Sequence, residues 1–210
     1  MIADDIIGFV KSDLSIYGST LILLLILILW VIFRELRWIV LPLAICSFSV
    51  ISTAGILGLF GWEITVISSN FIALQLIITI SIVLHLIVRY RELCLKYTKS
   101  SQSKLVLNTI LSKANPSFFA IITTIAGFGS LVLSNIQPVV NLGWMMSAGI
   151  AMSLLIAFII FPTLLIKLNR SKPYTKFEKN MRLTTICANI VEKRPKTIFI
   201  STVFTIIFAI

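Results

Sequence analysis

Four polar residues within one apolar run of the sequence are the best candidates for chemistry: Gln75, Thr79, Ser81 and His85. Amide, hydroxyl and imidazole groups can bind a polar substrate group, and an imidazole can also carry a proton. Gln75 and Thr79 are four residues apart, so on a helix they share one face. We interpret the four residues as a candidate intramembrane polar pathway. The alternative is that they bond to neighbouring helices and hold a bundle together, which is the more frequent role.

A second group combines glycines and threonines: Thr123, Thr124, Gly127 and Gly129. Glycine removes side-chain bulk and allows two helices to approach closely, and threonine hydroxyls can form hydrogen bonds across the contact. We therefore predict a helix-packing surface at these residues. The glycines do not form a phosphate-binding loop, because no strand precedes them and no helix N-terminus follows.

Catalytic and metal-binding patterns are missing from the sequence. It contains no nucleophile elbow, no Walker motif, no HExxH run and no carboxylate pair in an apolar run. The three cysteines, Cys46, Cys94 and Cys187, are widely spaced and form no CxxC motif, so we predict free thiols and no metal site. We expect neither enzymatic activity nor a cofactor.

The composition identifies the elements that must position these residues. The chain is 58% hydrophobic and 12% charged, and its mean hydropathy is +1.05, whereas soluble domains are about 25% charged. Five runs are long enough to cross a bilayer as helices: Tyr17–Phe33, Ile39–Phe60, Thr65–Val88, Ser117–Leu133 and Leu142–Ile166. Lipid does not tolerate open strand edges, so the predicted fold is an all-α, polytopic transmembrane helical bundle. A sixth apolar run begins near Thr197 and is still apolar at Ile210. We expect it to be a truncated helix.

Charge predicts the orientation of the spans. The net charge is +10, and every Lys and Arg except Lys11 falls in the segments between spans one and two, between spans three and four, and after span five. By the positive-inside rule these segments are cytoplasmic and the N-terminus is outside. The basic residues are spread over three loops without a nucleic-acid-binding motif, so we expect no nucleic-acid partner. Residues 167–196 can also contact anionic lipid head groups.

Two segments carry a resemblance to a known family. Residues 65–92 end in a His-x-x-x-Arg-Tyr-Arg-Glu run, His85 to Glu92, and resemble the fourth transmembrane helix of resistance-nodulation-division (RND) superfamily exporters of the mycobacterial-membrane-protein-large (MMPL) type. Residues 116–150 are similar to the helix pair that follows in that family, and residues 161–165 resemble the end of its sixth helix. The five spans also match the arrangement of a sterol-sensing domain, which belongs to the same superfamily.

The resemblance implies a division of the chain and a function. Residues 1–16 would be the tail of an extracytoplasmic domain, 17–166 the five-helix membrane domain, 167–196 a cytoplasmic linker and 197–210 the start of a further helix. The chain would then be a fragment, one membrane half of an efflux transporter in the bacterial inner membrane. Its partners would be the bilayer, the missing second half or further copies, and a hydrophobic small molecule or lipid substrate.

Two alternatives to that function stay open: a non-transporting sterol- or lipid-sensing bundle, and a truncated non-functional gene product. One departure from the family pattern bears on the choice. Proton-coupled members carry an acidic residue at the position of Ser81. A serine cannot hold the charge that a proton relay requires, so the resemblance does not extend proton coupling to this position.

Overall fold

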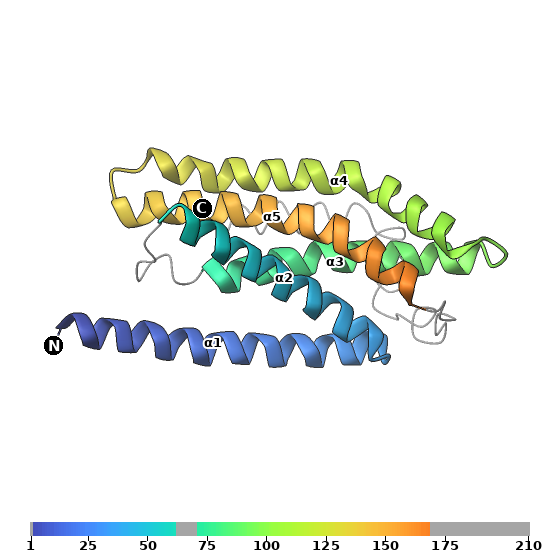
Figure 1. The fold of residues 1–210 in the computed structure, drawn as a ribbon, viewed down its shortest axis with the longest axis horizontal. Coiled ribbons are helices and arrows are strands. Elements are labelled where there is room, and N and C mark those ends of the chain that lie inside the picture. Colours follow the sequence, from blue (N-terminus) through green and yellow to red (C-terminus); the bar gives the residue numbers. More distant parts are fainter. Residues whose placement is uncertain (1, 62–70, 169–210) are drawn as a thin grey trace, which may run out of the picture. The chain divides into compact units, whose positions relative to one another are not determined.

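The chain folds into helices throughout the part that can be described. The computed structural model describes the backbone of residues 2–61 and 71–168, and the side chains of residues 16, 18–61 and 71–168. These residues belong to one compact unit. Its elements, shown in Figure 1, are α1 (Ile2–Phe33), α2 (Arg37–Leu59), α3 (Phe71–Lys96), α4 (Gln102–Ser130), the short 3-10 helix η2 (Leu131–Leu133) and α5 (Gln137–Lys167). The predicted all-α class is confirmed.

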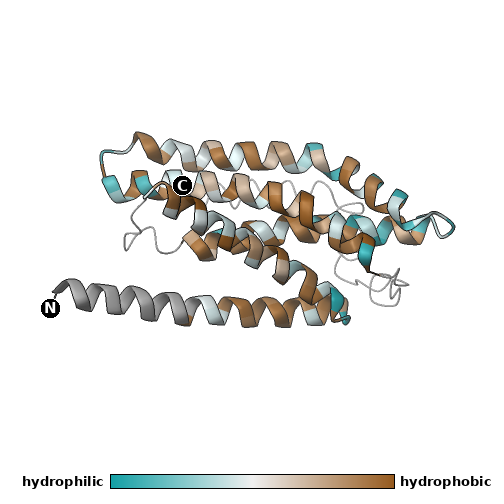
Figure 2. Ribbon diagram, in the orientation of Figure 1, coloured by the Kyte–Doolittle hydropathy of each residue, from teal (hydrophilic) through white to brown (hydrophobic). Residues whose placement is uncertain are grey.

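Within the described residues, four helical stretches are long and apolar enough to cross a bilayer: Arg37–Leu59, Phe71–Lys96, Gln102–Leu133 and Gln137–Lys167. They correspond in order to the second to fifth predicted spans. The first predicted span corresponds to Gly18–Phe33, the apolar part of α1, which is shorter than the other four. Figure 2 shows the hydrophobic residues running along these helices. The predicted linker and sixth span, from residue 169 onward, lie outside the described residues.

The start of the fourth span differs from the prediction. The predicted span begins at Ser117, yet α4 begins at Gln102 and carries Pro116 inside it. The earlier turns are helical because Leu105, Val106 and Thr109, at helical spacing, are buried in the bundle. Proline has no N–H to donate to the preceding turn, so the helix loses one backbone hydrogen bond there. A helix can continue past such a proline with a bend. Figure 1 shows this bend in α4.

Helix α5 is central to the packing, because it contacts α2, α3 and α4. Its buried face includes Met145, Met146, Ile150 and Phe161. Close approach to α4 and η2 requires Gly143, where a Cβ atom would lie 2.8 Å from the carbonyl oxygen of Phe128. By contrast, α1 contacts only α2 and α3 to any extent and leaves most of its large apolar side chains exposed.

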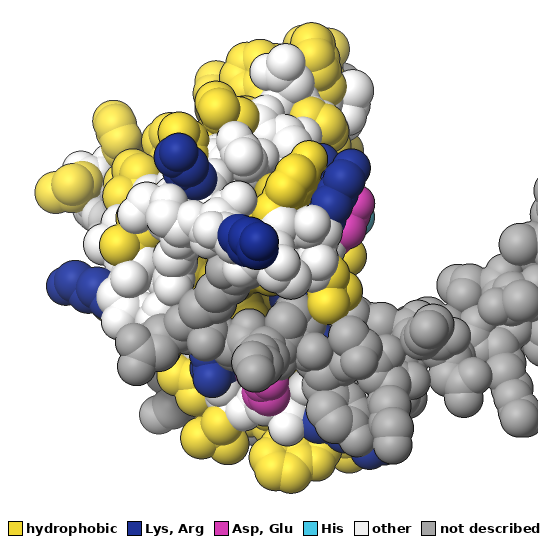
Figure 3. Space-filling view, turned by 90° about the vertical axis from the view of Figure 1, so that its right-hand side faces the viewer, with side chains coloured by type: hydrophobic (Ala, Val, Ile, Leu, Met, Phe, Trp, Pro, Cys, Tyr) yellow, Lys and Arg dark blue, Asp and Glu magenta, His cyan; other side chains and the backbone are white. Residues whose placement is uncertain are grey.

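Basic residues gather at one end of the bundle. The α1–α2 turn, the α3–α4 turn and the end of α5 all lie at this end, on the right of Figure 1. These turns and helix ends carry Arg34, Arg37, Lys96, Lys99, Lys104 and Lys167. Figure 3 looks onto this end and shows lysine and arginine side chains across it. The loops predicted to share one side of the membrane therefore do share one end of the described bundle.

Candidate functional site

Two of the predicted pathway residues lie in the middle of the bundle. Gln75 and Thr79 of α3 are fully buried and face Ser49 and Thr53 of α2 and Ser153 of α5, which are also fully buried. These five residues, the buried polar cluster, join three helices. The four-residue spacing of Gln75 and Thr79 places both on the face of α3 that meets the other two helices, as predicted.

The side-chain amide of Gln75 is the centre of this cluster. Its Nε2 donates to Thr53 Oγ1 at 2.7 Å and to Ser49 Oγ at 3.0 Å. The oxygens Ser49 O, Gly149 O and Ser153 Oγ each lie 3.3 Å from the same nitrogen. An amide nitrogen has only two protons, so the two shorter contacts account for both of its donors.

Hydroxyl groups extend the cluster from α3 to α5. Thr79 Oγ1 lies 2.7 Å from Gln75 O and 2.8 Å from Ser153 Oγ. Ser153 Oγ in turn lies 2.8 Å from both Gly149 O and Ser49 Oγ. The cluster contains no ionisable group, so its residues cannot take up a charge. Its chemistry is that of interhelical hydrogen bonds, which stabilise membrane bundles.

Ser81 and His85 lie elsewhere. Both are exposed on another face of α3 and line a cavity of about 400 Å³ between α3 and α4. Ser81 follows Thr79 by two residues, and two helical steps rotate a side chain by about 200°. The four residues that we interpreted as one polar pathway therefore form two separate pairs in the described structure: Gln75 with Thr79 inside, and Ser81 with His85 at the cavity.

The predicted packing residues on α4 make local contacts. The hydroxyls of Thr123 and Thr124 donate to Ala120 O in their own helix, at 2.8 and 2.7 Å. A Cβ atom at Gly127 or Gly129 would meet nothing within 4 Å. The described residues supply no packing partner at these positions, so the packing role assigned to them stays a prediction.

Close packing instead depends on two glycines of α5 that sequence reasoning missed. Besides Gly143, a Cβ atom at Gly149 would lie 3.0 Å from Gln75 Oε1 and 3.3 Å from Thr53 Cγ2. Gly149 therefore makes room for the buried polar cluster. The signal that could have found it is the small-x-x-x-small spacing of Gly149 and Ser153, which is typical of close helix pairs in membranes.

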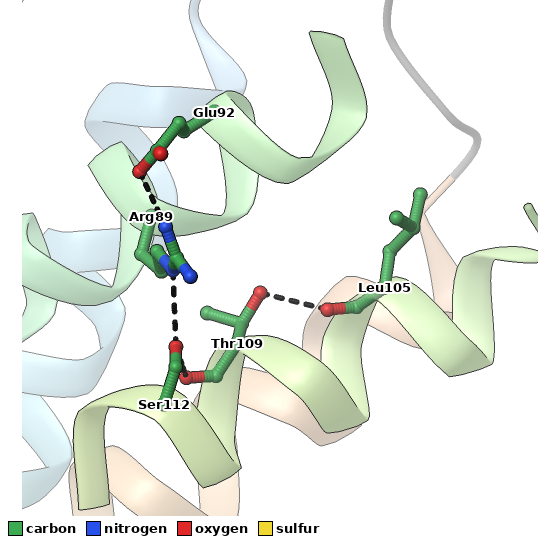
Figure 4. A network of polar contacts seen from close by, with 5 residues as sticks. All are labelled: Arg89, Glu92, Leu105, Thr109 and Ser112. Atoms are coloured by element: carbon green, nitrogen blue, oxygen red, sulfur yellow. Dashed lines mark hydrogen bonds and ion pairs between the residues drawn. The ribbon is translucent and has the colours of Figure 1, made fainter. Parts of the chain in front are cut away.

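The first arginine of the Arg-Tyr-Arg-Glu run ties α3 to α4. Arg89 Nη1 forms an ion pair with Glu92 at 2.8 Å, and Arg89 Nε donates to Ser112 Oγ at 3.1 Å. Figure 4 shows this connection continuing along α4, where Ser112 Oγ donates to Thr109 O and Thr109 Oγ1 donates to Leu105 O. Arg89 thus joins α3 to α4 next to their connecting turn, and Glu92 pairs with it from the same helix.

The second arginine of the run is buried among aromatic rings. Arg91 is 4% exposed, and its guanidinium carbon lies 5.1 Å from the centre of the Phe33 ring and 5.9 Å from that of Trp38. Trp38 also packs against Tyr90, with ring centres 6.0 Å apart. Cation–π contacts of this kind are stronger when they are shielded from water. They hold the α1–α2 turn against the end of α3.

Comparison with known proteins agrees with these local features. A family model described as the MMPL family matches residues 1–198. The chain belongs to the MMPL family. A search of the curated proteins finds no match for it.

Membership of the MMPL family confirms the resemblance on which the sequence interpretation relied. With its four long apolar helices, this MMPL protein is an integral membrane protein of RND type. In it, His85 at the start of the family run lines one cavity. Arg89 and Arg91 of the same run join α3 to α4 and to α1 and α2, respectively. Cys46 is a buried free thiol, as predicted; Cys94 is also buried, and Cys187 lies outside the described residues.

Proposed function

We propose that this MMPL protein is one membrane half of an RND-type exporter, that it moves hydrophobic or lipid-like substrates outward, and that it works without enzymatic chemistry. The observation that carries the proposal is the family match over residues 1–198. The bundle fits the role because its interior is fixed by the buried polar cluster while its outer surface stays apolar. A rigid bundle with a lipid-compatible surface can pack against a second half.

The exposed apolar side chains are consistent with contact to lipid or to a partner protein on several sides of the bundle. They include Leu23 and Leu27 on α1, Ile51 on α2, Phe119 on α4 and Ile159 on α5, each more than half exposed. Such surfaces mark contact with a membrane or with another protein. We propose that part of this surface meets the bilayer and part meets the second half of the exporter or another copy of the chain.

The basic end supports an orientation in the plasma membrane of a bacterium. Positively charged turns are retained in the cytoplasm, so we place the α1–α2 and α3–α4 turns there and the N-terminus of α1 outside. Substrate leaving the cytoplasmic leaflet would then first meet the end of the bundle that holds His85, Arg89 and Arg91.

Deletion of the gene in its source organism tests the function. We expect deletion to raise the cellular accumulation of a lipophilic dye, and the wild-type gene supplied in trans to restore it. Complementation with the Gln75→Leu, Thr79→Val double variant should be weaker at equal protein level, because the helices lose their common polar centre. Unchanged accumulation after deletion would contradict an exporter.

One observation favours a second candidate, a lipid-sensing bundle that does not transport. In the part of the chain with described side chains, the only acidic residues are Glu35 and Glu92, both at the basic end, so no carboxylate lies at mid-membrane. If deletion leaves dye accumulation unchanged but alters the lipid composition of the membrane or its regulation, the sensing function replaces the export function.

A further inference from the structure

The cavity between α3 and α4 has a mainly apolar lining with several polar side chains. It measures about 400 Å³, within the range of roughly 300–1,000 Å³ that is typical of ligand sites. Ser81 and His85 line it from α3, and Lys113 and Ser117 line it from α4. None of these four side chains forms a hydrogen bond or an ion pair with another residue in the described ranges.

The lack of partners is informative because nearby hydroxyls are satisfied. Thr124 lines the same cavity and donates to Ala120 O at 2.7 Å, and Thr109 donates to Leu105 O one turn before Lys113. The nearest acid along α3, Glu92, is already paired with Arg89 at 2.8 Å. The half-buried side chain of Lys113 is therefore left with no anion from the described part of this chain, although a charge shielded from water is costly without a partner.

The cationic group lies at one end of the cavity. His85 lies one turn before Arg89, whose Nε bonds Ser112, the residue next to Lys113. His85 and Lys113 thus mark the end closest to the basic turns. The rest of the lining includes Ile77, Ile78 and Ile121. Along α4, Lys113 and Thr124 are separated by about 16 Å of helix, so the cavity presents a cationic end followed by a mainly apolar stretch.

We propose that this cavity binds a single-chain amphiphile with an anionic head group. The carboxylate or phosphate of the head pairs with Lys113 and accepts hydrogen bonds from His85 and Ser117, and the hydrocarbon chain runs along the isoleucines toward mid-membrane. A charge-assisted hydrogen bond is about twice as strong as a neutral one, so the charge of the head group controls affinity. The chain is held by burial of apolar area.

Such an amphiphile would be a substrate class for the proposed exporter. Only its role as a substrate rests on the proposed function; its binding to the cavity does not. Binding can be measured without transport, so the two can fail separately. The full 210-residue chain is placed in nanodiscs of phosphatidylcholine, which has no net charge. Binding of a fluorescent fatty acid is followed, and oleate, oleyl alcohol or phosphatidylglycerol is added as competitor.

Two pairs of variants on α4 locate the site. Lys113→Gln removes the cation, and Lys104→Gln, on an exposed side chain outside the cavity, is its control. Ala120→Phe fills the cavity, and its control is Ala114→Phe, which enters a separate apolar pocket between α4 and α5. All variants are first checked for a single symmetrical peak in size-exclusion chromatography.

The expected result is saturable binding of oleate, with oleyl alcohol about tenfold weaker, because it lacks the charge that Lys113 recognises. Lys113→Gln should weaken oleate by about tenfold and leave oleyl alcohol unchanged, while Ala120→Phe weakens both. Equal affinity of oleate for wild type and Lys113→Gln would overturn the proposal even if Ala120→Phe fails to fold. Displacement of the probe by phosphatidylglycerol but not by oleate would assign the cavity to membrane phospholipid and overturn it as well.

Discussion

Thr79 Oγ1 lies 2.8 Å from Ser153 Oγ, and this contact joins α3 to α5 across 74 positions of the sequence. Both side chains are fully buried, and Ser153 also lies 2.8 Å from Ser49 Oγ on α2. One hydroxyl of α5 therefore connects the two helices on either side of it. Because the contact lies in the lipid-embedded part of the bundle, water cannot replace it when it is lost.

A double-mutant cycle on Thr79→Val and Ser153→Ala should show that the two side chains are coupled. We expect a coupling free energy of about 0.6 kcal/mol, and up to about 1.7 kcal/mol, the range found for interhelical hydrogen bonds in membranes. The measurement is reversible unfolding in mixed micelles. Thr163→Val combined with Ser153→Ala is the control, because the exposed Thr163 bonds only to Ile159 O, and its effect should be additive. Additivity of Thr79→Val and Ser153→Ala would contradict the contact.

Gly143→Ala should destabilise the protein although alanine is the better helix former. Its Cβ would lie 2.8 Å from Phe128 O and 3.1 Å from Leu131 Cβ, so α5 must move away from α4, at a cost of about 1–3 kcal/mol. Gly127→Ala is the matched control, since nothing lies within 4 Å of its Cβ, and it should be neutral or stabilising by up to about 1 kcal/mol. Thermal unfolding in detergent distinguishes the two. Equal melting temperatures would show that Gly143 is not a packing contact.

Arg91→Lys should destabilise the protein by about 1 kcal/mol, because lysine lacks the flat guanidinium that stacks on Phe33 and Trp38. Arg89→Lys is the control on the same helix. The Arg89 side chain is 30% exposed and pairs with Glu92, so its replacement should cost less than about 0.5 kcal/mol. Unfolding in detergent followed by tryptophan fluorescence measures the loss, and Trp38 is one of the four tryptophans that contribute to the signal. A larger loss for Arg89→Lys than for Arg91→Lys would be inconsistent with the aromatic cluster.

Single cysteines at opposite ends of the bundle test the orientation. Cys46, Cys94 and Cys187 are replaced by alanine, and Ser100→Cys and Asn135→Cys are introduced separately, in the α3–α4 turn and before α5. We expect a membrane-impermeant maleimide to label Asn135→Cys on cells with a permeabilised outer membrane. Ser100→Cys should react only after the inner membrane is opened, because it lies with the basic turns. The reverse pattern would invert the topology.

The sequence alone predicted the class of fold and the order of the spans. Runs of apolar residues such as those within α2 and α3 leave no alternative to helices in lipid, and the basic residues of the turns marked one end of the bundle. The run from His85 to Glu92 and the segment 116–150 together indicated the family, because their residue types and spacing are local properties of the chain. These features need no knowledge of which helix lies beside which.

Only the tertiary structure decided what each polar residue contacts. A hydropathy scale hardly distinguishes Thr79 from Ser81. Because of the helical rotation between them, Thr79 contacts Ser153, whereas Ser81 lines the cavity together with Lys113. The same holds for glycine: Gly127 and Gly143 are identical in sequence terms, and only Gly143 faces another backbone within 3 Å. A helix face acquires its role from the neighbouring helix, and a local pattern does not specify that neighbour.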